Sequence, residues 1–445
     1  MASTCVKRTP SSDGNNKKFT WSGWVKRSQI GVSQHLWSTW YQNDARYSYF
    51  QFNADDTLEV YSGIFSTSPS STSMYLNTKA KFRDTNGWYH IVLRADTDDG
   101  TQADRVRVYV NGVSQEFDSG HSNGQTLPSS GATTFYNKQY LHTLGRYANT
   151  GGFFDGLMSH VHWCDGYSYA PTEFGETDTT TGEWKIKTSP SVSYGTNGFF
   201  ILKDGNSTTD QSGNSLSFTT EGTLTKTEDN PSDVFATLNP LAGSSSNNTL
   251  SNGNTSLQVG SGWRWRPSTL APSKGKFYYE VKMTGSTPLY EVVGVVPYVN
   301  WKDIDGETIG LGESVGWVMS GAVKKDNSTE YTGNTYTVGD VVCVAVDLDN
   351  RKIYFRKNAD AWENSGDPTS GATGTGAVSL STTLDDWSLS TSAAGADAGS
   401  SLNYGNGYFG TTAISSAGTN ASNIGLFEFD VPTGYTALSL KGMNS

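Results

Sequence analysis

The chain has 445 residues, of which 17% are charged and 12% are aromatic, and 49 of them are glycine. This length exceeds what one hydrophobic core usually organises, so we expect about two or three domains, and the mixture of aromatic, glycine and small polar residues favours an all-β protein rich in turns. The net charge of −11 opposes binding to nucleic acid or to an anionic membrane, and no apolar run approaches the roughly 20 residues that a membrane span needs.

The cysteines are three in number and far apart: Cys5, Cys164 and Cys343. An odd number at this spacing does not organise a disulfide framework, so we expect reduced and mostly buried thiols. No apolar run follows the basic pair Lys7 and Arg8, so we also expect no secretory signal.

The first 168 residues contain strand patterns in close succession. Residues 19–26 alternate bulky and small side chains, as a half-buried strand does, and further strands are predicted at 47–52, 58–61, 88–94 and 105–113. The order of the segments 87–93, 106–112 and 152–163 resembles that of laminin-G or concanavalin A-type jelly rolls. The resemblance implies a β-sandwich over residues 1–168.

Residues 169–239 are rich in Thr, Gly and Ser and hold only brief apolar runs, such as residues 198–202. Because long unstructured loops are uncommon inside compact domains, we expect a connector with short strands that packs on its neighbours. Its sequence resembles that of a connector that recurs in virion proteins of tailed bacteriophages, where it joins two domains of these same types.

Residues 240–445 form the predicted second domain. Residues 341–346 are apolar enough to be covered on both faces, and the turn at Asp349 and Asn350 joins them to a second β-prone run, so 341–358 is predicted to be a hairpin. With residues 275–283 and 292–296, this hairpin resembles the central strands of SPRY domains, which display variable loops for binding. The predicted fold is thus two antiparallel β-sandwich (jelly-roll) domains and a Thr/Gly/Ser-rich connector.

Aromatic residues in polar surroundings are the candidate ligand-binding residues, because such rings stack on sugars or anchor protein interfaces. An equal alternative is that they pack within the sandwiches. The candidates are Trp37, Trp40, Tyr41, Trp263, Arg264, Trp265 and Tyr408.

Two acidic clusters have the oxygen-rich character that Ca²⁺ prefers. The first holds Asp96, Asp98, Asp99 and Asp104, at a place where laminin-G-like domains carry calcium, and the second spans residues 303–307. Neither has EF-hand spacing, and a solvated hairpin loop is the favoured interpretation of both. Calcium is therefore a possible ligand, and no cofactor is required.

Signals for catalysis are weak. Residues 120–124 match the G-x-S-x-G pattern but lack the strand before and the helix after it. His160 and His162 share a strand face without a partner carboxylate, and packing is the favoured role. Glycosidases on jelly rolls need paired carboxylates, whereas Glu280 and Asp347 stand alone in their strands. We therefore expect no enzymatic activity.

These observations lead to one functional expectation. We expect a structural and binding component of a bacteriophage particle, a tail fibre or receptor-binding appendage that contacts a glycan or protein receptor on the host surface. Other virion proteins are the further partners, and the family type implies a homo-oligomer, a trimer in a fibre. The alternatives are a capsid decoration protein, a polysaccharide-degrading enzyme and an intracellular SPRY adaptor, and fold resemblance alone does not decide between them.

Overall fold

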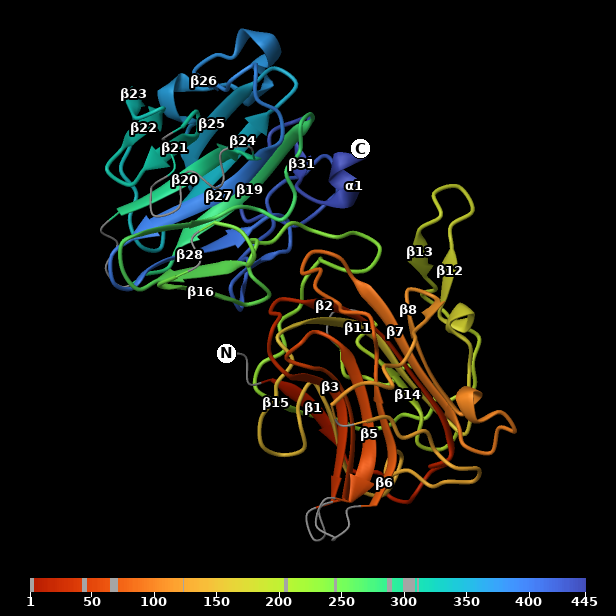
Figure 1. Ribbon diagram of the computed structural model, residues 1–445. Helices are drawn as coiled ribbons and strands as arrows, with labels where there is room; N and C mark the ends of the chain where they lie inside the picture. Colours follow the sequence, from red (N-terminus) through yellow and green to blue (C-terminus); the bar gives the residue numbers. More distant parts are fainter. Residues whose placement is uncertain are drawn as a thin grey trace. The chain divides into compact units, whose positions relative to one another are not determined.

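The computed structural model describes residues 4–41, 46–64, 71–122, 124–203, 207–243, 246–285, 290–298, 309 and 312–445. The chain divides into two compact units, Met1–Lys226 and Thr227–Ser445, and each is built from β-sheets (Figure 1). This confirms the predicted all-β class. Among the described residues, the helical elements are short, and none is long and apolar enough to cross a membrane. They are η1 (Gln102–Asp104), η2 (Pro171–Glu173), η4 (Glu363–Ser365), η5 (Pro368–Thr373) and α1 (Leu440–Met443).

Unit 1 is a sandwich of two antiparallel sheets. Sheet A has the strand order β15 (Thr219–Glu221), β1 (Cys5–Arg8), β10 (Leu141–Leu144), β3 (Gln34–Tyr41), β4 (Arg46–Phe52), β5 (Leu58–Ile64), β6 (Ser71–Asn77). Sheet B has the order β14 (Phe199–Ile201), β11 (Gly156–Asp165), β2 (Lys18–Arg27), β7 (Tyr89–Asp96), β8 (Val106–Val110), β9 (Val113–Ser114).

The core of unit 1 follows from the alternation of side chains along these strands. Inward residues such as Phe50, Val60 and Leu93 are almost completely buried, and burial of each large apolar side chain contributes roughly 1.5–3 kcal/mol. Aromatic rings join the two sheets: Trp37 of sheet A stacks on Trp163 of sheet B with ring centroids 5.5 Å apart. Each core strand thus keeps one face for residues that point away from the sandwich interior.

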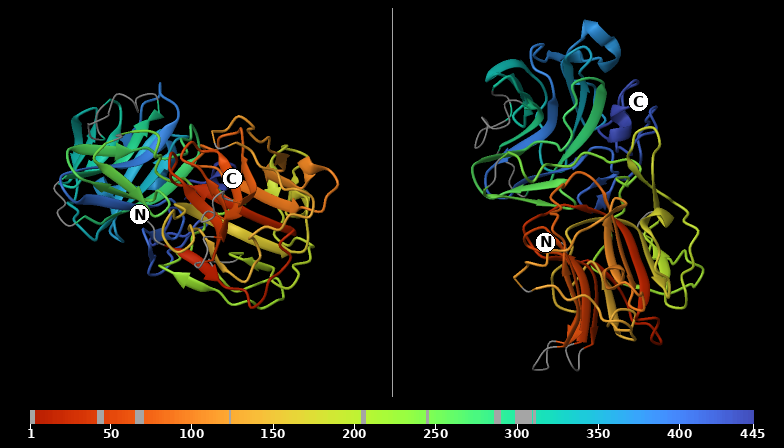
Figure 2. Two further views of the ribbon diagram at one scale, coloured as in Figure 1. Left: turned by 60° about the horizontal axis from the view of Figure 1, so that its bottom comes forward. Right: turned by 45° about the vertical axis from the view of Figure 1, so that its right-hand side comes forward.

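Residues 169–226, which lie in the predicted connector, supply strands to unit 1. β14 pairs with β11, and β15 pairs with β1. The hairpin β12 (Gly175–Thr177) and β13 (Trp184–Ile186) lies beside sheet B (Figure 2), where the indole N–H of Trp184 donates to Nδ1 of the buried His90 at 3.0 Å. Asp165 ties this segment down, since its carboxylate accepts hydrogen bonds from the backbone N–H of Asn197 and from the side chain of Asn137.

Unit 2 also contains two sheets. Sheet C has the order β16 (Asn248–Ser251), β17 (Ser256–Val259), β28 (Ala398–Asn403), β19 (Lys276–Met283), β24 (Val341–Asp347), β25 (Lys352–Lys357), β26 (Val378–Ser379), with β31 (Thr436–Ala437) parallel to β19. Sheet D has the order β18 (Trp263–Arg266), β27 (Trp387–Ala394), β20 (Tyr290–Pro297), β21 (Val315–Val318), β22 (Ala322–Lys325), β23 (Ser328–Thr332). The pair β29 (Tyr408–Phe409) and β30 (Thr412–Ala413) is separate.

The predicted hairpin of unit 2 is confirmed. β24 and β25 pair in antiparallel register, and every residue of β24 is buried. β24 is covered on both faces, because the alternating residues Val342 and Cys343 belong to two different apolar clusters. The buried Asp347 at its end pairs with Lys276 at 2.9 Å. These residues stabilise the sheet, and because they are buried, ligand-binding groups are expected elsewhere in the chain.

Candidate functional site

A carboxylate lies on the face of sheet A that points away from the core. Along β5, Leu58 and Val60 enter the core, so Glu59 and Tyr61 project from the opposite face. In register, Gln51 of β4 and Asn77 of β6 flank Glu59. Strand pairing therefore creates a polar row across three neighbouring strands.

The carboxylate of Glu59 is only 5% exposed and accepts four hydrogen bonds. The hydroxyl of Tyr49 donates to Oε1 at 2.6 Å, and the hydroxyl of Tyr75 donates to Oε2 at 3.0 Å. The amides of Gln51 and Asn53 donate the other two, at 3.3 Å and 3.0 Å. All four donors are neutral groups, so these contacts fix the carboxylate without cancelling its charge.

Tyrosine rings surround this carboxylate. Tyr49 stacks on Tyr61 with centroids 5.1 Å apart, and Tyr47 lies 5.6 Å from Tyr61. The ring of Tyr147, from the loop after β10, lies 5.9 Å from Tyr49. We call Tyr47, Tyr49, Glu59, Tyr61, Tyr75 and Tyr147 together the tyrosine face. Tyr49, Tyr75 and Tyr147 keep part of their surface exposed, whereas Tyr47 and Tyr61 are buried.

The charge of Glu59 acts on its neighbours. Burial first, and then the adjacent Glu59 carboxylate, raise the pKa of Tyr49 well above its usual value of 10.0. Burial also raises the pKa of Tyr47. The two hydroxyls therefore stay protonated at neutral pH, and Tyr49 remains a hydrogen-bond donor to the carboxylate.

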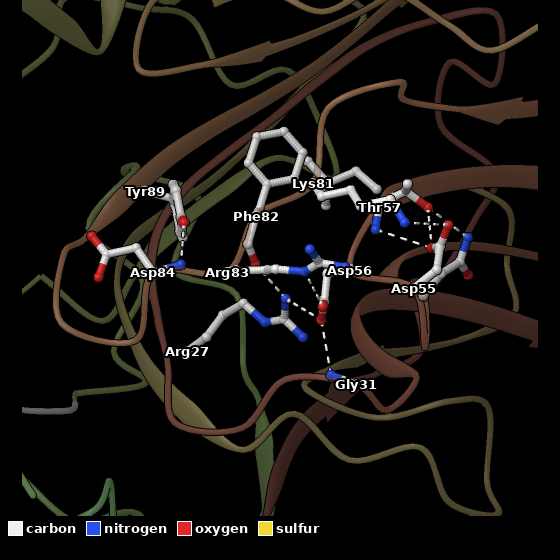
Figure 3. A network of polar contacts seen from close by, with 12 residues as sticks. Arg27, Gly31, Asp55, Asp56, Thr57, Lys81, Phe82, Arg83, Asp84 and Tyr89 are labelled. Carbon is white, nitrogen blue, oxygen red and sulfur yellow. Dashed lines mark hydrogen bonds and ion pairs between the residues drawn. The ribbon is translucent and has the colours of Figure 1, made fainter. Parts of the chain in front are cut away.

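The turn between β4 and β5 sets the position of Glu59. Asp56 in this turn has a φ of 71° and is buried, and its carboxylate accepts hydrogen bonds from Arg27, Arg83 and the backbone N–H of Gly31 (Figure 3). Arg27 is completely buried, and its guanidinium lies 4.2 Å from the centroid of the Phe52 ring. A strained turn persists when its surroundings over-determine it, as this network does.

The predicted ligand-binding residues Trp37, Trp40 and Tyr41 all belong to β3, and they are divided between the two faces of sheet A. Trp37 lies in the core and is 3% exposed. Trp40, three residues further along β3, lies partly exposed on the outer face and pairs in register with Tyr47. Tyr41 stacks on Tyr140 with centroids 4.7 Å apart. Of the three, Trp40 therefore borders the tyrosine face.

The predicted residues of unit 2 do not form one group. Trp265 is completely buried, whereas the ring of Trp263 lies 5.9 Å from that of Tyr290, whose surface is 57% exposed. Arg264 donates from Nε to the backbone oxygen of Ser246 at 2.7 Å. Tyr408 lies partly exposed on β29, a strand outside sheet D.

Each of the four predicted calcium ligands contacts a different partner, either a basic side chain or a backbone N–H. Asp96 pairs with Lys18 at 2.7 Å, Asp98 with Lys17 at 3.4 Å, and Asp104 with Arg107. Asp99 accepts a hydrogen bond from the backbone N–H of Thr101. Among the described residues, no group of three or more His, Cys, Asp or Glu is placed to hold a metal ion. Residues 303–307, the second predicted cluster, lie outside the described residues.

Among the other candidates for chemistry, His160, His162 and Glu280 are buried, whereas Ser122 is exposed. The rings of His160 and His162 both pack against Phe200. Glu280 is completely buried, and its carboxylate accepts hydrogen bonds from the backbone N–H groups of Glu428 and Phe429, so it anchors the C-terminal segment. Burial raises the pKa of Glu280 to about 7. Ser122 of the G-x-S-x-G pattern lies in an exposed loop.

Sequence reasoning missed Glu59. A single carboxylate in a strand has no local motif, and the alternation Leu58, Glu59, Val60, Tyr61 was the available signal that Glu59 faces outward beside a tyrosine. The contribution of Tyr75 and Tyr147 depends on strand pairing and on a loop that is distant in the sequence.

Residues 3–172 match a family model described as the concanavalin A-like lectin/glucanases superfamily. Over these residues the chain has a concanavalin A-like fold. The match covers the strands that carry the tyrosine face and ends within unit 1. No curated protein matches the chain.

Several solved structures are similar to parts of the chain. The SPRY domain of human HERC1 is 15% identical, with a TM-score of 0.31, and the match covers 37% of this chain and 96% of that one. A human SPRY domain is 16% identical, with a TM-score of 0.28 and coverage of 35% and 94%. A heptameric SAP-like pentraxin from Limulus polyphemus is 15% identical, with a TM-score of 0.25 and coverage of 38% and 72%. TM-scores this low carry no functional conclusion.

Proposed function

We propose that this chain is a non-catalytic glycan-binding protein and that the tyrosine face is its binding site. The observation that carries the proposal is the partly exposed set of rings around the hydrogen-bonded Glu59 on the outer face of sheet A. The apolar faces of sugars stack on aromatic rings, while a few fixed polar groups bind their hydroxyls. Trp40 extends the aromatic surface along β3.

The number of carboxylates on this face supports binding without hydrolysis. Glycosidases use two carboxylates, one on each side of the scissile bond. Among the described outward residues of β3 to β6, Glu59 is the one carboxylate. Two tyrosine hydroxyls and two amides already occupy its oxygens, so it acts as a fixed polar group in the proposal.

We place this function on the particle of a tailed bacteriophage, in a tail fibre or receptor-binding appendage. The support is the resemblance of residues 169–239 to the connector of phage virion proteins. A glycan or protein of the host surface is the receptor in this proposal, and other virion proteins and further copies of the chain are the partners. Repeated copies, as in a trimeric fibre, convert weak contacts into avidity. Capsid decoration is the second location that we consider.

A binding experiment tests the site. The full chain is titrated against immobilised surface glycans of the host bacterium, beside the variants Tyr75→Ala and Tyr167→Ala. Tyr167 is a matched control, because it is a 40% exposed tyrosine of unit 1 outside the tyrosine face. We expect Tyr75→Ala to weaken binding by roughly fivefold or more, since truncation of an aromatic anchor at a binding surface costs more than about 1 kcal/mol. Equal binding by both variants and the wild type, or no binding at all, contradicts the proposal.

Imaging of intact particles tests the location. Particles labelled with an antibody to this chain are expected to carry the label on the tail. Label on the head supports capsid decoration and contradicts the tail appendage. Particles without label contradict the virion proposal as a whole.

A further inference from the structure

Two buried polar atoms beside Glu59 have no hydrogen-bond partner among the described residues. They are Oε1 of Gln51 and Nδ2 of Asn77, and the two side chains are 7% and 1% exposed. In register they lie on either side of Glu59. Buried polar atoms are nearly always paired, so two open ones at one place indicate a site where a ligand or a water completes the bonding.

The open bonding capacity at this site consists mainly of acceptors. Tyr49 uses its hydroxyl hydrogen on Glu59, so the remaining lone pair of its oxygen accepts. Oε1 of Gln51 is a second acceptor, and Nδ2 of Asn77 is the open donor. A ligand that donates hydrogen bonds therefore fits better than one that accepts them.

The electrostatics of the site favour a positive ligand. The partners of Glu59 in the described part of the chain are neutral, so its negative charge lacks a contacting cation. The faces of tyrosine rings also attract cations, and ring faces beside a carboxylate suit an ammonium group. The net charge of −11 of the whole chain acts in the same direction.

We propose that the tyrosine face selects glycans that carry a free amino group and rejects acidic glycans. This inference rests on the proposed glycan-binding function and adds the chemical class of the ligand. The ammonium group lies against the tyrosine rings near Glu59, and its N–H groups donate to the open acceptors. A carboxylate-bearing sugar brings a negative charge toward Glu59, and its carboxylate group, which only accepts hydrogen bonds, cannot donate to those acceptors.

Three probes of similar length test the selectivity by titration calorimetry with the full chain. They are an oligomer of glucosamine, its fully N-acetylated counterpart, which lacks the charge, and an oligomer of galacturonic acid. At about 50 mM salt we expect glucosamine to bind at least about tenfold more tightly than galacturonate, with the N-acetylated oligomer between them. Raising the salt to about 500 mM leaves most of the preference in place, because Glu59 is 5% exposed and salt screens buried charges much less than exposed ones.

Variants connect the preference to Glu59. Glu59→Gln keeps the shape of the side chain and removes its charge, so the three affinities converge. Asn77→Asp keeps the acceptor that Asn53 uses and adds a charge beside Glu59, so the preference increases. Glu116→Gln is the matched control, because Glu116 is an exposed carboxylate paired with Lys79 outside the site, and the preference stays unchanged. If Glu59→Gln fails to fold, Asn77→Asp decides the matter.

The outcomes separate this inference from the function on which it rests. Equal binding of the three probes, or a preference that Asn77→Asp leaves unchanged, overturns the selectivity and leaves glycan binding in place. Absence of binding by all three probes overturns the selectivity. If host surface glycans also fail to bind, the proposed function falls as well.

Discussion

Tyr49 on β4 donates its hydroxyl hydrogen to Glu59 on β5 across 2.6 Å, although both side chains lie on the face of sheet A that points away from the core. Outer sheet faces usually meet solvent, yet Glu59 is 5% exposed here and Tyr61 is 3% exposed. A dense polar and aromatic cluster at such a place has no part in joining the two sheets. The glycan-binding proposal gives it a role.

The hydrogen bond between Tyr49 and Glu59 is expected to stabilise unit 1. Tyr49→Phe removes one of four donors to a buried carboxylate, and we expect a loss of about 1–3 kcal/mol in the free energy of unfolding. Urea denaturation of the full chain measures it, and Tyr167→Phe on the exposed surface serves as the control. An unchanged midpoint for Tyr49→Phe argues against a stabilising role of this bond.

Unit 1 is expected to lose stability in acid. Burial lowers the pKa of His35 to about 4 and that of His90 to about 3, from the ordinary value of 6.5. The unfolded state therefore binds more protons below about pH 6.5, so the free energy of unfolding falls as the pH drops from there toward 3–4, by up to about 1.4 kcal/mol per pH unit and histidine. His142, with its pKa lowered to about 3, adds a third contribution.

The cysteines allow this loss to be measured in the full chain. Cys164 of unit 1 is completely buried, so a thiol reagent active at acidic pH modifies it only after unit 1 opens. We expect the urea midpoint for modification of Cys164 to be lower at about pH 5 than at about pH 7. A midpoint that does not change with pH is inconsistent with neutral buried histidines.

Unit 2 is expected to respond to pH in the opposite direction. Burial raises the pKa of Glu280 to about 7 and that of Glu291 to about 8, from the ordinary value of 4.5. The folded state holds more protons between these limits, so the stability contributed below about pH 4.5 is lost as the pH rises toward 7–8. Modification of the buried Cys343 reports on unit 2. Its urea midpoint is expected to be higher at about pH 5 than at about pH 7, and the reverse order contradicts this prediction.

Removal of calcium is expected to leave unit 1 unchanged. Lys18, Lys17 and Arg107 already neutralise three of the four acidic residues in the loop region of residues 96–104. A bound ion stabilises a protein by mass action, so the midpoint of thermal unfolding rises with the ion where a site exists. We expect equal midpoints in excess calcium and in excess chelator. A higher midpoint in calcium contradicts this expectation and supports a calcium site at the acidic cluster of residues 96–104.

The sequence predicts the strands well, because alternation is a local property. The hairpin of β24 and β25 is legible from an apolar run and a turn, and the strands of residues 19–26 and 47–52 from their periodicity. The tyrosine face is harder to predict because it is built by pairing. Trp37 and Trp40 lie three residues apart in β3 and therefore on opposite faces, but only the pairing with β4 shows that Trp37 is the one in the core. The lysine partners of the acidic cluster are likewise distant from it in the sequence. In the fold, Lys18 at the start of β2 pairs with Asp96, and Lys17 just before β2 pairs with Asp98.

Hydrogen–deuterium exchange of the full chain with and without a bound host surface glycan tests the location of the site most directly. We expect protection in peptides that cover β4, β5 and β6 and in the loop that carries Tyr147, since ligand contact there reduces the opening of these strands. Protection confined to unit 2 or to the segment beside sheet B, with β4 to β6 unchanged, contradicts the central claim that the tyrosine face binds glycans.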